Sequence, residues 1–170
     1  MATATINIGT QREQRGELVF TGANDIGPKL TITLPLVQLS PTAAHSFIGD
    51  TYGLLEMTGE VLAGSDGSFG TVEHPDDAMV SPDIGLYYVG TGVITWKPEP
   101  TTAVPTPSAR DIGNVNLFEF TQTVVQLDHW NHRGGIRIKD FRPVTEQSAT
   151  VRITMDEFSA ENLRLAMLSA

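Results

Sequence analysis

The sequence predicts a mainly β protein, a β-sandwich or partly closed barrel with one α-helix packed on its flank. Short runs of alternating apolar and polar residues recur along most of the 170 residues, and turn residues separate them. Only one segment, close to the C-terminal end, has the spacing and the end signals of a helix. Many strands beside a single helix favour β layers around one core. At this length we expect one domain over residues 1–170.

Three strands are expected in the first part of the chain, over residues 17–21, 29–39 and 54–62. Alternation is strictest in the second strand, which Pro35 interrupts. Because proline cannot donate a ladder hydrogen bond, this position suggests an edge strand or a bulge. Glycine and aspartate within residues 64–67 predict a turn that ends the third strand.

The middle of the chain alternates between irregular and strand-like segments. Residues 73–83 are polar and proline-rich, which is typical of a linker. Strands are expected to resume at residues 86–89 and 92–96. Residues 97–108 contain four prolines, so we expect an extended surface loop there rather than an interior strand.

The C-terminal part predicts two more strands and then the helix. One long alternating strand covers residues 113–130, and a second covers residues 150–155. The helix is expected over residues 156–168. Ser159 is a suitable N-cap, and acidic residues lie near the positive end of the helix dipole. The residues expected to pack this helix on the sheet are Leu163, Ala166 and Met167, which recur with the helical period.

The chain is acidic, and its charge is unevenly placed. The net charge is −9, with 12 carboxylates against 4 cations in residues 1–108 and 8 against 7 in residues 109–170. This balance argues against a protein that binds nucleic-acid phosphates, because affinity for nucleic acid comes largely from cationic side chains. No apolar run approaches the roughly 20 residues of a membrane-spanning helix, so no membrane partner is expected. The chain has no cysteine for a disulfide or a thiolate metal site.

No group of residues predicts catalysis or cofactor binding. Asp128, His129 and His132 suggest a metal hydrolase, but two histidines three apart share a face only on a helix, and a strand and loop are expected here. The chain has no G-x-S-x-G sequence, and no glycine-rich segment opens a helix with a phosphate-binding lysine. We therefore expect no enzyme, no metal site and no cofactor, with the metal hydrolase as the lesser alternative.

A basic segment with aromatic residues, 129–142, is expected to contact another protein. Arginine and tryptophan are favoured at interface hot spots, and glycine lets a loop adapt on docking. A basic segment on an acidic chain further suggests head-to-tail contact between copies. The residues expected in this inter-subunit contact loop are His129, Trp130, His132, Arg133, Gly134, Gly135, Ile136, Arg137 and Lys139.

Two groups of motifs resemble one known family. The sequences IGNV at residues 112–115, followed by the long strand, and DEFSAENL at residues 156–163 resemble the N-terminal half of the siphophage major tail tube protein family. The sequences ELVFTG at residues 17–22 and GEVL at residues 59–62 resemble the C-terminal half of that family. Together these matches cover much of the chain.

The halves occur here in exchanged order, which suggests a circular permutation. Residues 84–170 resemble the family's N-terminal half and residues 1–72 its C-terminal half, so residues 73–83 would link the old termini. Permutation is tolerated where termini lie close together at the surface. We therefore expect residues 3–8 to lie near residues 168–170.

The resemblance implies a fold like that of phage tail tubes and type VI secretion tubes, and a structural role. Copies would form hexameric rings stacked into a hollow tail tube that conducts double-stranded DNA without binding it specifically. The tail terminator, distal tail and tape-measure proteins would be further partners, and the location would be the virion tail, assembled in the host bacterial cytoplasm. Glu56 and Glu60 are expected to face the lumen, where a negative potential repels phosphates.

A second interpretation explains the strands and the acidity equally well. In it the chain is a β-sandwich binding module, such as a capsid decoration or adhesin domain. Such a module acts as a discrete monomer or trimer, whereas the first interpretation requires hollow rings or tubes.

Overall fold

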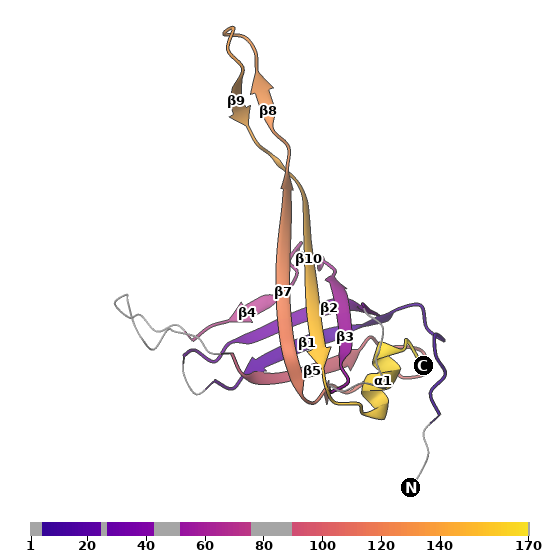
Figure 1. The fold of residues 1–170 in the computed structure, drawn as a ribbon. Helices are drawn as coiled ribbons and strands as arrows, with labels where there is room; N and C mark the ends of the chain where they lie inside the picture. Colours follow the sequence, from indigo (N-terminus) through magenta and orange to yellow (C-terminus); the bar gives the residue numbers. More distant parts are fainter. Residues whose placement is uncertain (1–4, 25–26, 43–51, 76–89, 170) are drawn as a thin grey trace.

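A computed structural model describes residues 5–24, 27–42, 52–75 and 90–169. Within them, strands follow one another until a single helix comes last, so the predicted mainly β fold with one flanking helix is confirmed (Figure 1). The strand expected at residues 86–89 and most of the predicted linker lie outside the described residues. The elements are β1 (Gln14–Gly22), β2 (Thr31–Pro41), β3 (Leu55–Val61), β4 (Thr71–Glu73), β5 (Gly92–Pro98), β6 (Arg110–Asp111), β7 (Val115–Gln126), β8 (His129–Asn131), β9 (Ile138–Phe141), β10 (Val144–Met155) and α1 (Ala160–Ala166).

Eight of the described strands form one antiparallel sheet. Its order is β6-β5-β1-β2-β3-β10-β7, with β4 paired to β2, and β8 and β9 form a separate two-stranded sheet. The large sheet curls on itself, so that β7 and β10 cross over β1 and β5 (Figure 1). In the described part of the chain no ladder joins β7 to β5 or β6, so the barrel is only partly closed.

Pro35 marks a bulge inside β2. The register runs from Gly16 opposite Val37 to Leu18 opposite Leu34, so three steps along β2 match two along β1. Because β2 pairs with β1 on one side and with β3 and β4 on the other, it is an interior strand. The predicted bulge is confirmed and the edge-strand alternative is wrong. A residue without an N–H is tolerated here because a bulge interrupts the ladder.

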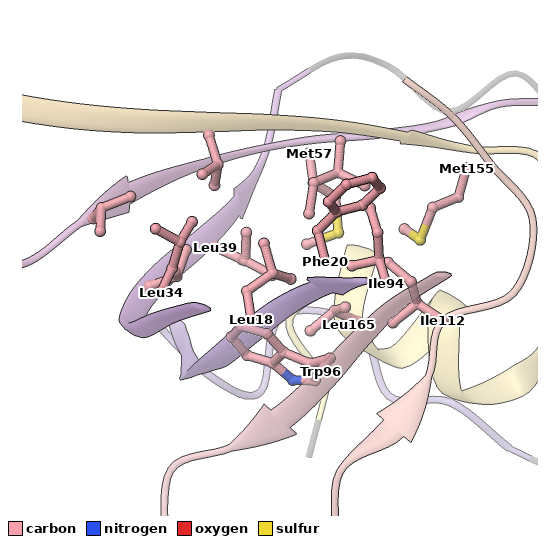
Figure 2. Packing of buried hydrophobic residues seen from close by; sticks show 14 of the residues in the cluster. Leu18, Phe20, Leu34, Leu39, Met57, Ile94, Trp96, Ile112, Met155 and Leu165 are labelled. Atoms are coloured by element: carbon pink, nitrogen blue, oxygen red, sulfur yellow. The ribbon is translucent and has the colours of Figure 1, made fainter. Parts of the chain in front are cut away.

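Alternate residues of the curled sheet fill one core (Figure 2). Leu18 of β1 and Trp96 of β5 are each 1% exposed, and Met57 of β3 is completely buried. Phe20 of β1 stacks on Phe118 of β7 with ring centroids 5.5 Å apart, so β7, at one end of the sheet, contacts β1 across the curl. Burial of each large apolar side chain stabilises the fold by about 1.5–3 kcal/mol, so this core holds the layers together.

Helix α1 is shorter than predicted. It begins at Ala160, after Ser159, whose side chain accepts a hydrogen bond from the backbone N–H of Asn162 at 3.2 Å. Asp156 and Glu157 lie before the helix instead of inside it. Both carboxylates accept hydrogen bonds from Asn114, and these contacts hold the segment against the start of β7.

The buried face of the helix also differs from the predicted one. Asn162, Leu165 and Ala166 are its buried residues. Of the predicted packing residues, Ala166 is buried, Leu163 packs against the core while partly exposed, and Met167 is the C-cap. The difference arises because the helix turns a polar residue, Asn162, toward the sheet, which an apolar period cannot reveal.

The two ends of the described chain lie side by side. The backbone N–H of Gly9 donates to the carbonyl oxygen of Met167 at 2.9 Å, and that of Gln11 donates to Leu168 at 2.8 Å. These bonds satisfy carbonyl groups at the C-terminal end of α1. Residues 3–4 and 170 of the expected junction lie outside the described residues. The bonds that are observed involve residues 9 and 11, just after the expected range, and among the described residues 5–8 no such contact is seen.

Candidate functional site

Strands β7 and β10 extend beyond the rest of the large sheet and carry a projecting arm (Figure 1). They pair as far as Gln126 opposite Val144. The supporting strand β3 ends at Val61, opposite Ala149. Beyond that point residues 123–148, which we call the arm, form a two-stranded ribbon with no third described strand beside it.

Both faces of the arm are exposed, although it carries many large apolar side chains. An isolated two-stranded hairpin is only marginally stable in water. Exposed apolar side chains gathered on one part of a surface are typical of interaction sites. The large apolar residues of the arm that are 44–74% exposed are Val124, Val125, Leu127, Ile136, Ile138, Phe141 and Val144.

At the tip of the arm, strands β8 and β9 hold Trp130 against two cations. The guanidinium carbon of Arg137 lies 4.7 Å from the centroid of the indole ring, and the ammonium nitrogen of Lys139 lies 5.2 Å from it. Cation–π contacts contribute about 0.5–1 kcal/mol each at exposed sites. They help to gather the cations of the tip on one surface.

The two carboxylates of the tip are paired within it. Asp128 accepts a hydrogen bond from Lys139 at 2.6 Å and lies 3.1 Å from Nε of Arg142, and the Lys139 hydrogen bond lowers the pKa of Asp128. Asp140 lies 2.6 Å from Nδ1 of His129. Among the described residues, no group of three His, Asp or Glu side chains is placed to hold a metal ion.

The tip is cationic on balance. Residues 128–142 hold four Lys or Arg against two Asp, whereas the rest of the chain holds seven Lys or Arg against eighteen Asp or Glu. Within the described part of the chain, neither Arg133 nor Arg137 forms an ion pair with a carboxylate. Both cations are therefore available to a partner.

The predicted contact loop is a β-hairpin, and its connecting loop holds both glycines. His129 and Trp130 lie in β8, Lys139 lies in β9, and residues 132–137 connect the two strands. Gly135 has a φ of 77°, a conformation that glycine adopts without steric cost and that suits a tight turn. The structure thus places all nine predicted contact residues together at the tip.

The outward face of β3, β10 and β7 is mostly polar, and we call it the polar face. Residues directly opposite each other on neighbouring strands share a face. Glu60 lies opposite Thr150 and Glu56 lies opposite Thr154, while the alternate residues of both strands turn into the core. The two predicted lumen residues therefore share the polar face. Its further polar and charged members are Thr58, Glu119, Thr121, Thr123, Glu146, Ser148 and Arg152.

One cation lies among the carboxylates of the polar face. Nη2 of Arg152 donates to Oε2 of Glu56 at 3.4 Å, and Nη1 lies 3.9 Å from Oε2 of Glu119. The three side chains come from the adjacent strands β10, β3 and β7, and all are 31–54% exposed. Strands β2, β3, β7 and β10 contain no other Lys or Arg.

The outer edge of β7 borders an apolar groove. Within the described chain β7 forms a ladder with β10 alone, so its other edge is unpaired. A groove of about 330 Å³ lies between parts of this strand and parts of β1, β2 and β5. Its apolar lining includes Phe20, Ile32, Ile94, Val115, Phe118 and Phe120. An unpaired strand edge is a site at which another chain can continue the sheet.

Two features of the site were not predicted from the sequence. One is the arm as a separate projecting ribbon, and the other is the pairing of Arg152 with carboxylates. The strand predicted at residues 150–155 begins at Val144, because the polar residues that precede Ala149 hide the alternation. One signal was present: Val124 and Val125 are adjacent, so one of them lies on each face of the strand. The pairing of Arg152 with Glu119 depends on the register between two strands, which no local pattern gives.

A comparison with protein families matches residues 1–71 and 87–170 to the family described as Protein of unknown function UCP028589. No curated protein and no solved structure matches the chain. Among the described residues, no helix has the length and apolar character to cross a membrane.

Proposed function

The chain belongs to the family Protein of unknown function UCP028589, and we propose that it is a structural virion protein that assembles with copies of itself. Hexameric rings stack into a hollow tail tube that conducts double-stranded DNA, and the role is structural rather than catalytic. One observation carries the proposal. It is the arm, whose apolar side chains are exposed on both faces of an unsupported ribbon.

The arm reaches too far for its own domain to cover it. From residue 123 to the turn at residue 134 a strand advances about 35 Å, at roughly 3.3 Å per residue. A compact domain of this size has a radius of gyration of about 15 Å. Fully burying one of the exposed Val, Leu, Ile or Phe side chains would stabilise the protein by about 1.5–3 kcal/mol. Among the described residues no third strand lies beside the arm to offer that burial, so a second molecule is the partner we infer.

The charge distribution favours a second copy as that molecule. The cationic tip carries Arg133 and Arg137 without carboxylate partners in the described structure, and the rest of the chain is strongly acidic. Complementary charges steer association and fix its orientation. Because the tip and the surface that receives it are different, the contact is heterologous. Such contacts close into rings or extend into tubes.

We assign the polar face to the lumen. It is rich in hydroxyl groups and carries Glu56, Glu60 and Glu119, so it suits a water-filled channel. A channel of negative potential repels DNA phosphates and lets the polymer slide. The unpaired edge of β7 gives a neighbouring subunit a place to continue the sheet around the lumen.

The resemblance to tail tube proteins agrees with this assignment. The contact between residues 9–11 and residues 167–168 supports the circular permutation, since it brings together the segments next to the proposed junction. In a virion tail the further partners are the tail terminator, distal tail and tape-measure proteins.

Negative-stain electron microscopy of the purified full-length chain tests the proposal directly. Hollow rings or tubes are expected, because the arm and the edge of β7 both require neighbours. Discrete monomers or trimers at every concentration would instead favour a β-sandwich binding module, such as a capsid decoration or adhesin domain.

A pair of variants tests whether the arm is responsible. Leu127→Ser with Phe141→Ser removes two apolar side chains that are 63% and 64% exposed, so assembly should fall by at least about tenfold while the circular dichroism spectrum stays unchanged. Val72→Ser with Val104→Ser removes two side chains that are 62% and 53% exposed away from the arm, and it should assemble like the parent. Equal loss in both variants would contradict the role of the arm.

A further inference from the structure

We propose that Glu56 and Glu119 mask Arg152, so that the single cation of the polar face cannot bind phosphate. The inference rests on the proposed function, because it concerns the surface that DNA would pass. The network itself lies within one chain, however, and can be tested whether or not the chain assembles.

The chemistry of arginine makes this cation the critical one. A guanidinium presents its N–H groups as a planar fork that matches two phosphate oxygens, and this pairing is among the strongest hydrogen-bonded contacts in proteins. Six exposed copies around a channel would form a ring of phosphate sites. Such a ring would hold DNA instead of letting it slide.

In the structure both ends of the fork face carboxylates. Nη2 of Arg152 donates to Glu56 at 3.4 Å, and Nη1 lies 3.9 Å from Glu119. Arg152 lies on β10, the middle strand, and the two glutamates lie on β3 and β7, the strands on either side. A phosphate that approached either terminal nitrogen would therefore meet a carboxylate within 4 Å of it.

Variants can distinguish the carboxylates that mask Arg152 from carboxylates that only add negative charge to the same face. Glu60 and Glu146 lie on the same polar face, but among the described contacts neither forms an ion pair with Arg152. Replacing either pair of glutamates with glutamine changes the net charge equally. Only the loss of Glu56 and Glu119 frees the guanidinium.

The experiment measures binding of a fluorescent double-stranded DNA of about 30 base pairs by anisotropy, at low salt and at about 0.2 M salt. The proteins are the parent, Glu56→Gln/Glu119→Gln, Glu60→Gln/Glu146→Gln, and the first pair combined with Arg152→Gln. The cations of the arm tip are present in all four, so their background contribution is the same.

We expect Glu56→Gln/Glu119→Gln to bind DNA at least about tenfold more tightly than the parent at low salt, and to lose this gain at the higher salt. Glu60→Gln/Glu146→Gln should change DNA affinity by less than about threefold. That is the effect we expect from losing two negative charges without freeing Arg152. Adding Arg152→Gln to the first pair should restore the parent's weak binding.

Equal gains for the two pairs, or a gain that survives Arg152→Gln, would overturn the masking of Arg152. Micrographs of the same samples report on the proposed function separately. A parent that never forms rings would count against the tube and leave the masking result intact.

Discussion

At the scale of single residues, Asn162 shows how a buried polar group can fix the docking of a helix. Its side chain is 1% exposed, and its amide nitrogen donates to the carbonyl oxygens of Ile112 at 2.7 Å and Glu157 at 3.0 Å. Its amide oxygen accepts a hydrogen bond from Nη1 of Arg110 at 2.8 Å. Burial lowers the pKa of Arg110, and the nearby Glu161 opposes this shift. Because all these groups are satisfied, the contact favours one position of α1 on the sheet.

Asn162→Ala should therefore destabilise the protein by about 2–3 kcal/mol, because it leaves buried partners without hydrogen bonds. Urea unfolding followed by circular dichroism measures the change. Asn116→Ala is the control, since Asn116 is exposed and its side chain makes only exposed hydrogen bonds, one donated to Asp156 and one accepted from Asn114. That variant should lose less than about 0.5 kcal/mol. Similar losses in the two variants would show that Asn162 does not anchor the helix.

At the scale of elements, the tip of the arm should be sensitive to acid. The hydrogen bond from Lys139 lowers the pKa of Asp128 below its ordinary value of 3.8. A carboxylate with a depressed pKa stabilises the fold fully above its unfolded pKa, and that contribution is lost as the pH falls through the folded value. We therefore expect the tip to loosen below the ordinary pKa of aspartate, while it stays paired near neutral pH.

The indole N–H signal of Trp130 in NMR spectra reports this loosening, and that of the buried Trp96 serves as an internal reference for the core. Asp128→Asn should give a Trp130 signal near neutral pH that resembles the acid form of the parent. Asp66→Asn is the control, because the pKa of Asp66 is also lowered, by hydrogen bonds with Ser68 in a turn outside the arm. A Trp130 signal that Asp128→Asn leaves unchanged would count against this prediction.

The same elements show how far the sequence could predict the fold. The strands expected at residues 17–21, 29–39, 54–62 and 92–96 all coincide with strands of the structure, because each buries alternate residues in one core. The arm could not be recognised in this way. Its two faces are both exposed, so the alternation of apolar and polar residues that marks a half-buried strand is lost there.

In the candidate site, too, the features that follow from a local sequence pattern were predicted, and those that depend on contacts between distant strands were not. A period of two was enough to predict that Glu56 and Glu60 share a face. The sequence also indicated that the basic segment was unusual in an acidic chain, although it predicted a loop there. The network around Arg152 joins three strands that are distant in sequence. Such contacts follow from the order and register of the sheet, which a single sequence does not contain.

At the scale of the whole molecule, the separation of charge sets the conditions for assembly. The hairpin of β8 and β9 lies at the far end of the arm (Figure 1). Residues 128–142, which form it, hold four of the cations, and most of the acidic residues belong to the rest of the sequence. Attraction between exposed charges is screened by salt, with a Debye length of about 10 Å at 0.1 M ionic strength. Apolar contacts of the arm are not weakened in this way. Assembly should therefore slow in salt without being abolished.

Neutralising the cations of the tip should slow assembly, as added salt does. Arg133→Gln/Arg137→Gln is expected to reduce the rate of assembly about tenfold at low ionic strength, because steering by complementary charges is lost, and to make the rate nearly independent of salt. Light scattering during dilution from about 0.5 M to about 0.05 M salt measures this rate. Arg12→Gln/Lys29→Gln removes two exposed cations outside the arm and changes the net charge equally. If this control slowed assembly as much as the tip variant, total charge would govern assembly, and the tip would have no special part in it.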